Sequence, residues 1–515
     1  MGPATGAAPR PCVFVVFGAS GDLNRRKIAP AVYNLAREGL LPERTVVLGY
    51  GRTELSDEEF RVHLEENVAE FSRERPIDPT TWKKLADRTF YHSGAYDAAE
   101  DYAGLKRRVE ELDARFKVGG SRLFYLAVPP TVTGSVLDNL DGCGLLEHRR
   151  ADESAERGYI RVVLEKPFGR DLQSARELNE LLESKLDESQ IFRIDHYLGK
   201  ETVQNILVLR FANAIFEPIW NNRYVKHIHV TVAETLGVED RAGFFERTGA
   251  LRDVLQNHVL QLLSLVTMEA PYSLAADSIR DEKAKVLRCL RPVQGEDLHC
   301  SVIRGQYGPG EIEGEKVCGY RREEGVAPDS NTETFVAMRT YIDNWRWAGV
   351  PVYLATGKRL PKHLTEVAVE FKAVPDVLFR TVQNAHIETN LLKIRVQPDE
   401  GVSMRIFTKT PGLALHIRQA EMDFPYSSVF LSNSPEAYER LVVDVMAGNS
   451  TLFARRDEIE LAWQFVDPIL RYWSEQPAPE FPNYPAGTWG PLHGEDFFRE
   501  DVCYAQLVPR GGKRG

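Results

Sequence analysis

The sequence lacks the features of a secreted protein, of a membrane protein and of a protein stabilised by a bound metal. No Cys-X-X-Cys pair occurs, so we expect neither a zinc site nor a disulfide framework. The first residues, MGPATGAAPRP, contain no apolar run of the kind found in a signal peptide, and no later run approaches a membrane-spanning length. We therefore expect a cytoplasmic protein with no membrane segment and no bound metal. The six scattered cysteines, which suit a reducing compartment, are Cys12, Cys143, Cys289, Cys300, Cys318 and Cys503.

The chain also has fewer positively charged residues than negatively charged ones. The chain has 64 Lys and Arg against 75 Asp and Glu, which gives a formal net charge of −11. Nucleic-acid binding needs many cationic contacts to phosphate, so this balance argues against it. A small anionic substrate would need a local cluster of Lys, Arg and His within an acidic protein.

The length of 515 residues, with 43% hydrophobic and 27% charged residues, predicts two ordinary globular domains. Short apolar strands alternate with helical stretches near the N-terminus, which indicates a doubly wound parallel sheet of the Rossmann type over residues 12–193. The expected strands are Cys12–Phe17, Val46–Tyr50, Leu123–Val128 and Val162–Glu165.

After about Ile194 the apolar residues alternate with polar ones. This period-2 pattern predicts an α+β domain over residues 194–510, built on a large, mainly antiparallel sheet with one exposed face. A long helical segment, Ala250–Met268, interrupts the strands. The expected strands begin at His227, Thr334, Glu366, Leu391 and Val402.

The first strand runs directly into GASGDL, where Gly18 and Gly21 form a turn that opens a helix. Such a turn points backbone N–H groups and the positive end of a helix dipole at a pyrophosphate. A plain strand-to-helix turn is the competing interpretation, because the spacing is not Gly-X-Gly-X-X-Gly. Arg52 follows the second strand, at the place where an NAD enzyme would carry an acidic residue. A guanidinium there suits the 2′-phosphate of NADP, to which Ser20 could also donate; a solvated surface arginine is the alternative.

Three later segments combine residue types that suit phosphate and proton chemistry: EKPFGRD from Glu165, RIDHYLGKE from Arg193 and RDVLQNHVLQ from Arg252. Each has a structural alternative, since a lone histidine such as His258 is most often packed in a core. In an extended stretch Asp195 and His196 would point to opposite sides. On an ideal α-helix Asp253 and His258 lie about 140° apart, so Asp195 is the better candidate to orient His258.

These motifs, with VLRFAN and ATGKRLP, resemble the glucose-6-phosphate dehydrogenase family in order and spacing over nearly the whole chain. The resemblance implies oxidation of β-D-glucose 6-phosphate at C1 to 6-phospho-D-glucono-1,5-lactone, the first step of the oxidative pentose phosphate pathway, with NADP as acceptor. It also implies a homodimer or homotetramer. His258 would be the general base and Asp195 its partner. The substrate would be bound by Lys166, His196, Tyr197, Lys200, Glu234, Asp253, Lys358 and His363. NADP would be bound by Gly18, Ser20, Gly21, Asp22, Leu23, Arg52 and Lys166.

Two departures from animal relatives favour a bacterial-type enzyme without their second, structural NADP site. Leu364 stands where those relatives have a lysine, and the tail after Gly487 does not match theirs. Two other functions remain open at this point. One is oxidation of an unphosphorylated sugar or polyol, as in the glucose-fructose oxidoreductase and inositol dehydrogenase group; the other is a non-catalytic NADP sensor. The cationic cluster in RIDHYLGKE argues against the first, and Asp195 with His258 argues against the second.

Overall fold

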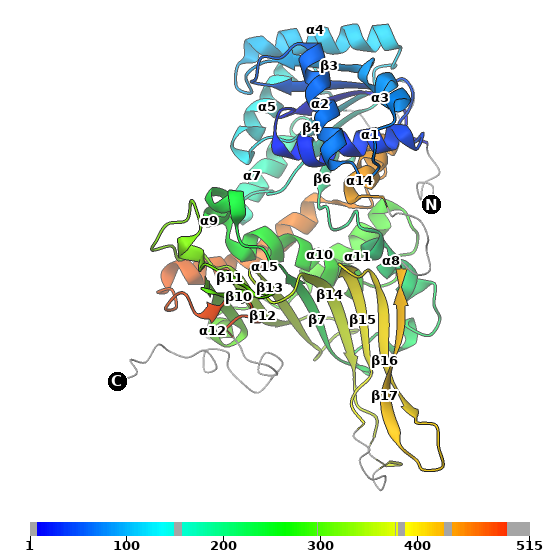
Figure 1. The fold of residues 1–515 in the computed structure, drawn as a ribbon, viewed down its shortest axis with the longest axis vertical. Coiled ribbons are helices and arrows are strands. Elements are labelled where there is room, and N and C mark those ends of the chain that lie inside the picture. Colours follow the sequence, from blue (N-terminus) through cyan, green and yellow to red (C-terminus); the bar gives the residue numbers. More distant parts are fainter. Residues whose placement is uncertain are drawn as a thin grey trace. The chain divides into compact units, whose positions relative to one another are not determined.

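The computed structural model describes residues 8–148, 157–295, 297–375, 377–379, 387–426 and 435–491 (Figure 1). Its residues cluster into two compact units. The first contains Met1–Lys200, Pro271–Asp281 and Ser434–Glu460, and the second contains the remainder. The predicted boundary between residues 193 and 194 falls close to Lys200, but two segments expected in the C-terminal domain, 271–281 and 434–460, belong to the first unit.

The first unit is built on a seven-stranded sheet in the order β18-β6-β5-β4-β1-β2-β3. All pairs are parallel except β18 with β6, so the predicted Rossmann-type sheet is confirmed. Its strands are β1 (Val13–Phe17), β2 (Val46–Gly51), β3 (Thr89–Ser93), β4 (Arg122–Leu126), β5 (Ile160–Leu164), β6 (Ile191–Ile194) and β18 (Phe453–Ala454). The edge strand β3 was not expected from the sequence.

Helices cover both faces of this sheet, as the blue and cyan parts of Figure 1 show. Val13 and Val15 join a core with residues of α4 and α5, whereas Val16 points to the opposite side, toward α1 and α2. This explains why the strands are apolar throughout rather than alternating. The helical elements are η1 (Asn24–Ile28), α1 (Ala29–Arg37), α2 (Asp57–Phe71), α3 (Pro79–Ala86), α4 (Ala99–Phe116), α5 (Pro130–Gly142), α7 (Leu172–Glu183), η2 (Glu188–Gln190) and α14 (Ala437–Ala447).

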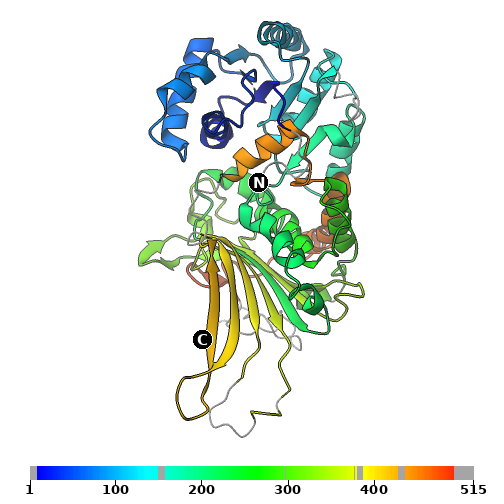
Figure 2. The ribbon, with the colours of Figure 1, turned by 90° about the vertical axis from the view of Figure 1, so that its right-hand side faces the viewer.

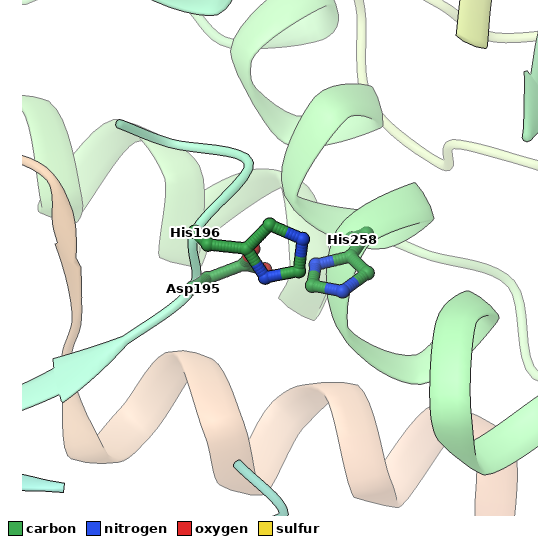
Figure 3. Close-up of side chains that lie close together, drawn as sticks. All are labelled: Asp195, His196 and His258. Atoms are coloured by element: carbon green, nitrogen blue, oxygen red, sulfur yellow. The ribbon is translucent and has the colours of Figure 1, made fainter. Parts of the chain in front are cut away.

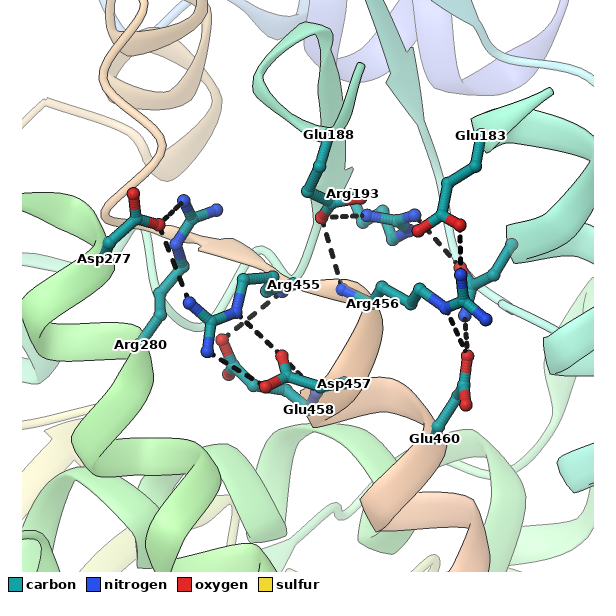
Figure 4. A network of polar contacts seen from close by, with 11 residues as sticks. Glu183, Glu188, Arg193, Asp277, Arg280, Arg455, Arg456, Asp457, Glu458 and Glu460 are labelled. Carbon is teal, nitrogen blue, oxygen red and sulfur yellow. Dashed lines mark hydrogen bonds and ion pairs between the residues drawn. The ribbon is translucent and has the colours of Figure 1, made fainter. Parts of the chain in front are cut away.

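A network of ion pairs and hydrogen bonds joins segments from the later part of the chain to the rest of the first unit (Figure 4). Arg193 of β6 forms an ion pair with Glu188 at 2.7 Å, and the same carboxylate accepts a hydrogen bond from the Arg456 backbone N–H at 3.2 Å. Arg455 contacts Asp281 at 2.6 Å and Asp277 at 3.6 Å. Charges far apart in the sequence thus hold 271–281 and 453–460 beside β6.

The second unit contains an eight-stranded sheet in the order β17-β16-β15-β14-β7-β13-β12-β8, whose yellow strands lie side by side in Figure 2. All its pairs are antiparallel except β13 with β7, so the prediction of a large, mainly antiparallel sheet is confirmed. The strands are β7 (Val225–Ala233), β8 (Val302–Gly305), β12 (Phe335–Tyr341), β13 (Pro351–Gly357), β14 (Leu364–Phe371), β15 (Leu391–Gln397), β16 (Gly401–Lys409) and β17 (Ile417–Pro425).

One face of this sheet is buried against helices. Strands β14 and β15 alternate buried with half-exposed residues along their length, as the sequence pattern predicted. Helix α8 contacts β15, and η5 contacts β7, β12 and β13. The helical elements and small strands are α8 (Glu201–Phe211), η3 (Glu217–Ile219), η4 (Glu239–Arg241), α9 (Ala242–Ala250), η5 (Leu251–Val259), α10 (Leu260–Thr267), α11 (Ala276–Arg288), α12 (Asp297–Ser301), η6 (Tyr320–Arg322), α15 (Arg456–Glu475), β9 (Tyr307–Gly308), β10 (Gly310–Ile312), β11 (Glu315–Val317) and β19 (Tyr484–Pro485).

The cysteines differ from expectation at one position. Cys12, Cys143, Cys289 and Cys318 are free thiols, but Cys300 is disulfide-bonded. Spacing along the chain could not predict this bond, because disulfide geometry depends on distance in the fold. Within the described residues no helix combines the length and apolarity that a membrane crossing needs.

Candidate active site

The glycine turn after β1 has the geometry of a phosphate-binding turn. Gly18 has φ +79°, and a Cβ atom at this position would stand 2.2 Å from the Ala127 carbonyl oxygen. The Gly18 carbonyl accepts a hydrogen bond from Gly21 N–H at 2.8 Å, and the helix begins at Asp22. Ser20, Gly21 and Asp22 are exposed. Backbone donors at the helix start are therefore accessible to a ligand.

Arg52 lies at the end of β2, beside this turn. Its guanidinium carbon is 5.6 Å from the centre of the Tyr96 ring, and the residue is exposed. Ser20 Oγ lies 3.3 Å from Thr53 Oγ1, so Ser20 and the residue after Arg52 are in contact. Within the first unit, the serine and the arginine predicted to bind a 2′-phosphate thus belong to one exposed surface. Asp22 forms a surface ion pair with Arg26 at 2.9 Å, and Leu23 is partly buried at the helix start.

The segment after β6 carries Asp195, His196, Tyr197 and Lys200 (Figure 3 labels the first two). Residues 196–199 form a turn rather than an extended stretch, so the predicted alternation of side chains ends at Ile194. Asp195 is buried, and its Oδ1 accepts a hydrogen bond from Tyr197 N–H at 3.0 Å. The Lys200 ammonium lies 4.3 Å from the centre of the Tyr197 ring. The turn therefore gathers the predicted phosphate donors.

Glu165 and Lys166 follow β5 directly, next to the segment after β6 in the parallel sheet. Lys166 precedes a cis proline, Pro167. The Tyr125 hydroxyl donates to Glu165, and Tyr438 also hydrogen-bonds to it. Burial raises the pKa of the Glu165 carboxyl to about 7, and nearby Asp195 adds to the rise, while both tyrosines and Lys166 oppose it.

His258 lies on η5, which is a π-helix over Leu251–Val259 (Figure 3). The predicted separation of about 140° between Asp253 and His258 applies to an ideal α-helix. In a π-helix the hydrogen bonds join residues i and i+5 rather than i and i+4, so that angle does not describe η5. Asp253 and His258 are both buried. Such π-segments are frequent at functional sites.

Two predicted sugar contacts meet in the second unit. Lys358 Nζ forms an ion pair with Glu234, and these residues lie just beyond the adjacent strands β13 and β7. Asp253 Oδ1 lies 3.7 Å from Arg241 Nη2. His363 is exposed and precedes β14. The basic residues Arg395 and Arg405 pair with Asp423 at 2.5 Å and Glu388 at 3.0 Å.

Sequence reasoning missed two carboxylates in these segments. Glu165 opens the EKPFGRD motif, yet it hydrogen-bonds to Tyr438, which is distant in sequence. Glu333 is buried and accepts a hydrogen bond from Leu251 N–H, the first residue of η5, at 3.1 Å. Its position before strand β12 carries no sequence signal for capping a helix 82 residues earlier.

Comparison with known proteins places both halves of the chain in one family. Residues 15–205 match the model "Glucose-6-phosphate dehydrogenase, NAD binding domain", and residues 207–505 match "Glucose-6-phosphate dehydrogenase, C-terminal domain". The chain is 44% identical over 504 residues to glucose-6-phosphate 1-dehydrogenase of Chlamydia muridarum, covering 97% of each chain. It is 47% identical over 489 residues to glucose-6-phosphate 1-dehydrogenase 2 of Mycobacterium tuberculosis, covering 95% of this chain and 93% of the relative.

Solved structures agree with these sequence matches. One described as glucose-6-phosphate dehydrogenase in complex with its substrate glucose-6-phosphate has a TM-score of 0.85 and 38% identity, and the match covers 98% of this chain and 99% of that one. Glucose-6-phosphate 1-dehydrogenase from Mycobacterium avium has a TM-score of 0.75 and 34% identity, with 93% and 96% covered.

Proposed function

Because the chain belongs to the glucose-6-phosphate dehydrogenase family, we propose that it oxidises β-D-glucose 6-phosphate at C1 to 6-phospho-D-glucono-1,5-lactone, with NADP as hydride acceptor. The observation that carries the proposal is similarity to glucose-6-phosphate 1-dehydrogenases along 97% of the chain. The segment RIDHYLGKE supports it, because its histidine, tyrosine and lysine suit a substrate phosphate.

NADP, rather than NAD, is the acceptor that the residues of the first unit favour. The NAD-binding-domain match supports a nicotinamide dinucleotide in general. The tight turn at Gly18 requires glycine, because a side chain there would collide with the Ala127 carbonyl, and it leads into exposed backbone donors that suit a pyrophosphate. Arg52 supplies a guanidinium where discrimination against NADP would need a carboxylate. When bound, the nicotinamide supplies the hydride acceptor.

The remaining chemistry falls to the chain's own residues. The C1 hydroxyl is far too weak an acid to ionise unaided near neutral pH, so it needs a general base, which we assign to His258. We assign to Asp195 the role of holding the imidazole in the required tautomer and stabilising its charged form. His196, Tyr197 and Lys200 bind the phosphate. Lys166, Glu234, Asp253 and Lys358 contact the sugar, and we assign a further substrate contact to the exposed His363.

The test is an assay of reduced nicotinamide formation with purified protein. We expect oxidation of glucose 6-phosphate with NADP, and much weaker activity with free glucose or myo-inositol, which lack the phosphate. Preference for an unphosphorylated sugar or polyol would overturn the assignment. Cofactor binding without turnover of any of the three would identify a sensor instead. Dialysis against a chelator should leave the rate unchanged, because none of the proposed steps uses a metal.

A further inference from the structure

Two tyrosine side chains from distant parts of the first unit contact one carboxyl group, that of Glu165, which the proposed reaction does not use. Tyr125 belongs to β4, Glu165 follows β5, and Tyr438 lies in the first turn of α14. The Tyr125 hydroxyl donates to Glu165 Oε1, and Tyr438 hydrogen-bonds to the same carboxyl group. Tyr125 is 1% exposed. The phenols therefore fix Glu165 from both the sheet and a helix.

This carboxyl group lies beside two residues that we assign to catalysis and substrate binding. Lys166 is its neighbour in the chain, and β5 pairs with β6 so that Leu164 is opposite Arg193. In this parallel register Glu165 adjoins Ile194, and Lys166 adjoins Asp195. Glu165 interacts electrostatically with both Lys166 and Asp195. The cluster thus occupies the carboxyl edge of the strands, where ligands bind in sheets of this type.

We propose that Glu165 is a positioning residue: Tyr125 and Tyr438 fix its carboxyl group, which orients Lys166 and sets the charge that faces Asp195. This inference rests on the proposed function, which assigns Lys166 to the substrate and Asp195 to the base. The charged or titratable groups around the carboxyl are Tyr125 from β4, Tyr438 from α14, Lys166 from its own segment and Asp195 from the segment after β6.

The electrostatics support a role in pH dependence. Burial, the largest effect, raises the pKa of Glu165 to about 7, so the carboxyl gains its charge near neutral pH. Below that pH the group is neutral and Lys166 keeps its full attraction for an anionic sugar phosphate. Above it, a negative charge stands beside Lys166 and weakens that attraction.

Infrared difference spectroscopy of the resting enzyme tests the cluster without substrate. We expect the carbonyl band of a protonated carboxyl group to disappear with a midpoint near pH 7, and Glu165→Gln to abolish that step. Tyr125→Phe and Tyr438→Phe each remove a donor that favours the charged form, so the midpoint should move to higher pH. A step that persists in Glu165→Gln, or a midpoint unmoved by both tyrosine variants, would refute the cluster.

Equilibrium binding of glucose 6-phosphate across the same pH range tests the positioning role. The dissociation constant of wild type, divided by that of Glu165→Gln, should rise roughly threefold to thirtyfold between acidic and alkaline pH, as one added charge at several ångströms predicts. His196 and the substrate phosphate are present in both binding measurements, so the effect of their own ionisation cancels in the ratio of the two dissociation constants. Glu180→Gln, an exposed change on α7, should match wild type.

Different results would contradict the proposed role of Glu165 and the proposed function of the protein. A ratio that stays constant with pH, in a protein that oxidises glucose 6-phosphate, would overturn the role of Glu165 and leave the proposed function intact. Absence of oxidation would overturn the proposed function. The infrared step would then still report the proton that Glu165 holds.

Discussion

At the scale of single residues, His258 carries the proposed proton transfer. Replacing it by asparagine removes the base but keeps a polar side chain on η5. We expect kcat to fall by about a hundredfold to ten-thousandfold, since a positioned base is worth that much. Substrate affinity should survive, because the phosphate and hydroxyl contacts lie elsewhere. Steady-state kinetics would measure both.

Asp195→Asn is the companion to this change. It should also lower kcat, and it should lower the apparent kinetic pKa of the base, because the imidazolium loses its counter-charge. A His258→Asn variant with near-normal kcat and an unchanged acid limb would show that another group accepts the proton.

Arg52 decides the choice of cofactor in our proposal. Arg52→Ala should weaken NADP binding roughly tenfold to hundredfold, the value of a charged hydrogen bond, and leave NAD binding nearly unchanged. Fluorescence titration with both cofactors would measure this. Arg107→Ala, an exposed arginine on α4, is the matched control. Equal losses for both cofactors would show that Arg52 does not contact the 2′-phosphate.

Lys200 tests the phosphate site separately. Lys200→Ala should raise KM for glucose 6-phosphate while NADP affinity and the weak activity on free glucose stay almost constant. A charged group that binds only the phosphate has no effect on a sugar without one. Equal losses for both sugars would make Lys200 a structural residue, which its contact with the Tyr197 ring could explain.

At the scale of elements, the position of η5 depends on a carboxylate outside it. Glu333 accepts from Leu251 N–H, and Gly249 makes this possible with φ +65°, since a Cβ there would stand 2.2 Å from Glu333 Oε1. Glu333→Ala leaves a buried donor unsatisfied and should cost about 1 to 3 kcal/mol in the free energy of unfolding.

Denaturant unfolding would measure this loss, and Glu333→Gln is the control because it keeps a carbonyl acceptor. Since η5 carries Asp253 and His258, we also expect kcat of Glu333→Ala to fall more than that of Glu333→Gln. Identical stability of the two variants would contradict a capping role.

At the scale of the whole molecule, we propose that the chain forms a homodimer or homotetramer through the half-exposed face of the eight-stranded sheet. Strand β17, at its edge, exposes Met422 by 60% and Phe424 by 44%. Apolar side chains at this exposure on a long edge strand mark an interaction surface. Isologous pairing of two copies would cover them.

Met422→Lys should therefore shift the mass in solution toward the monomer at low concentration, because the introduced charge would be buried between copies. Light scattering over a dilution series would measure the shift. Val62→Lys, on exposed α2, introduces the same charge at an apolar residue that is 54% exposed, and should leave the mass unchanged. A wild-type protein that is monomeric at all concentrations would refute the proposed assembly.

The fold class and the segments that carry the candidate site could be predicted from the amino-acid sequence alone. Apolar strands buried on both faces and strands with period-2 alternation are local patterns, so both sheets could be predicted from them. The turn at Gly18 and the motif around Asp195 are contiguous, so their chemistry is visible in the chain. Strand β3 was missed although it is as long as β1 and β4, and β13 was missed because it is buried on both faces and shows no period-2 alternation.

Features that depend on residues far apart in the sequence became visible only in the folded chain. The return of 434–460 to the first unit brings Tyr438 to Glu165, and burial in the fold raises the carboxyl pKa to about 7 against the opposing hydrogen bonds of Tyr125 and Tyr438. The hydrogen bonding of η5 is π-helical, which the α-helical periodicity expected from the sequence does not reveal. The hydrogen bond from η5 to Glu333 and the disulfide bond of Cys300 are two further features that the sequence pattern did not predict. Desolvation, hydrogen bonding and capping depend on distances in space, which local sequence patterns do not encode.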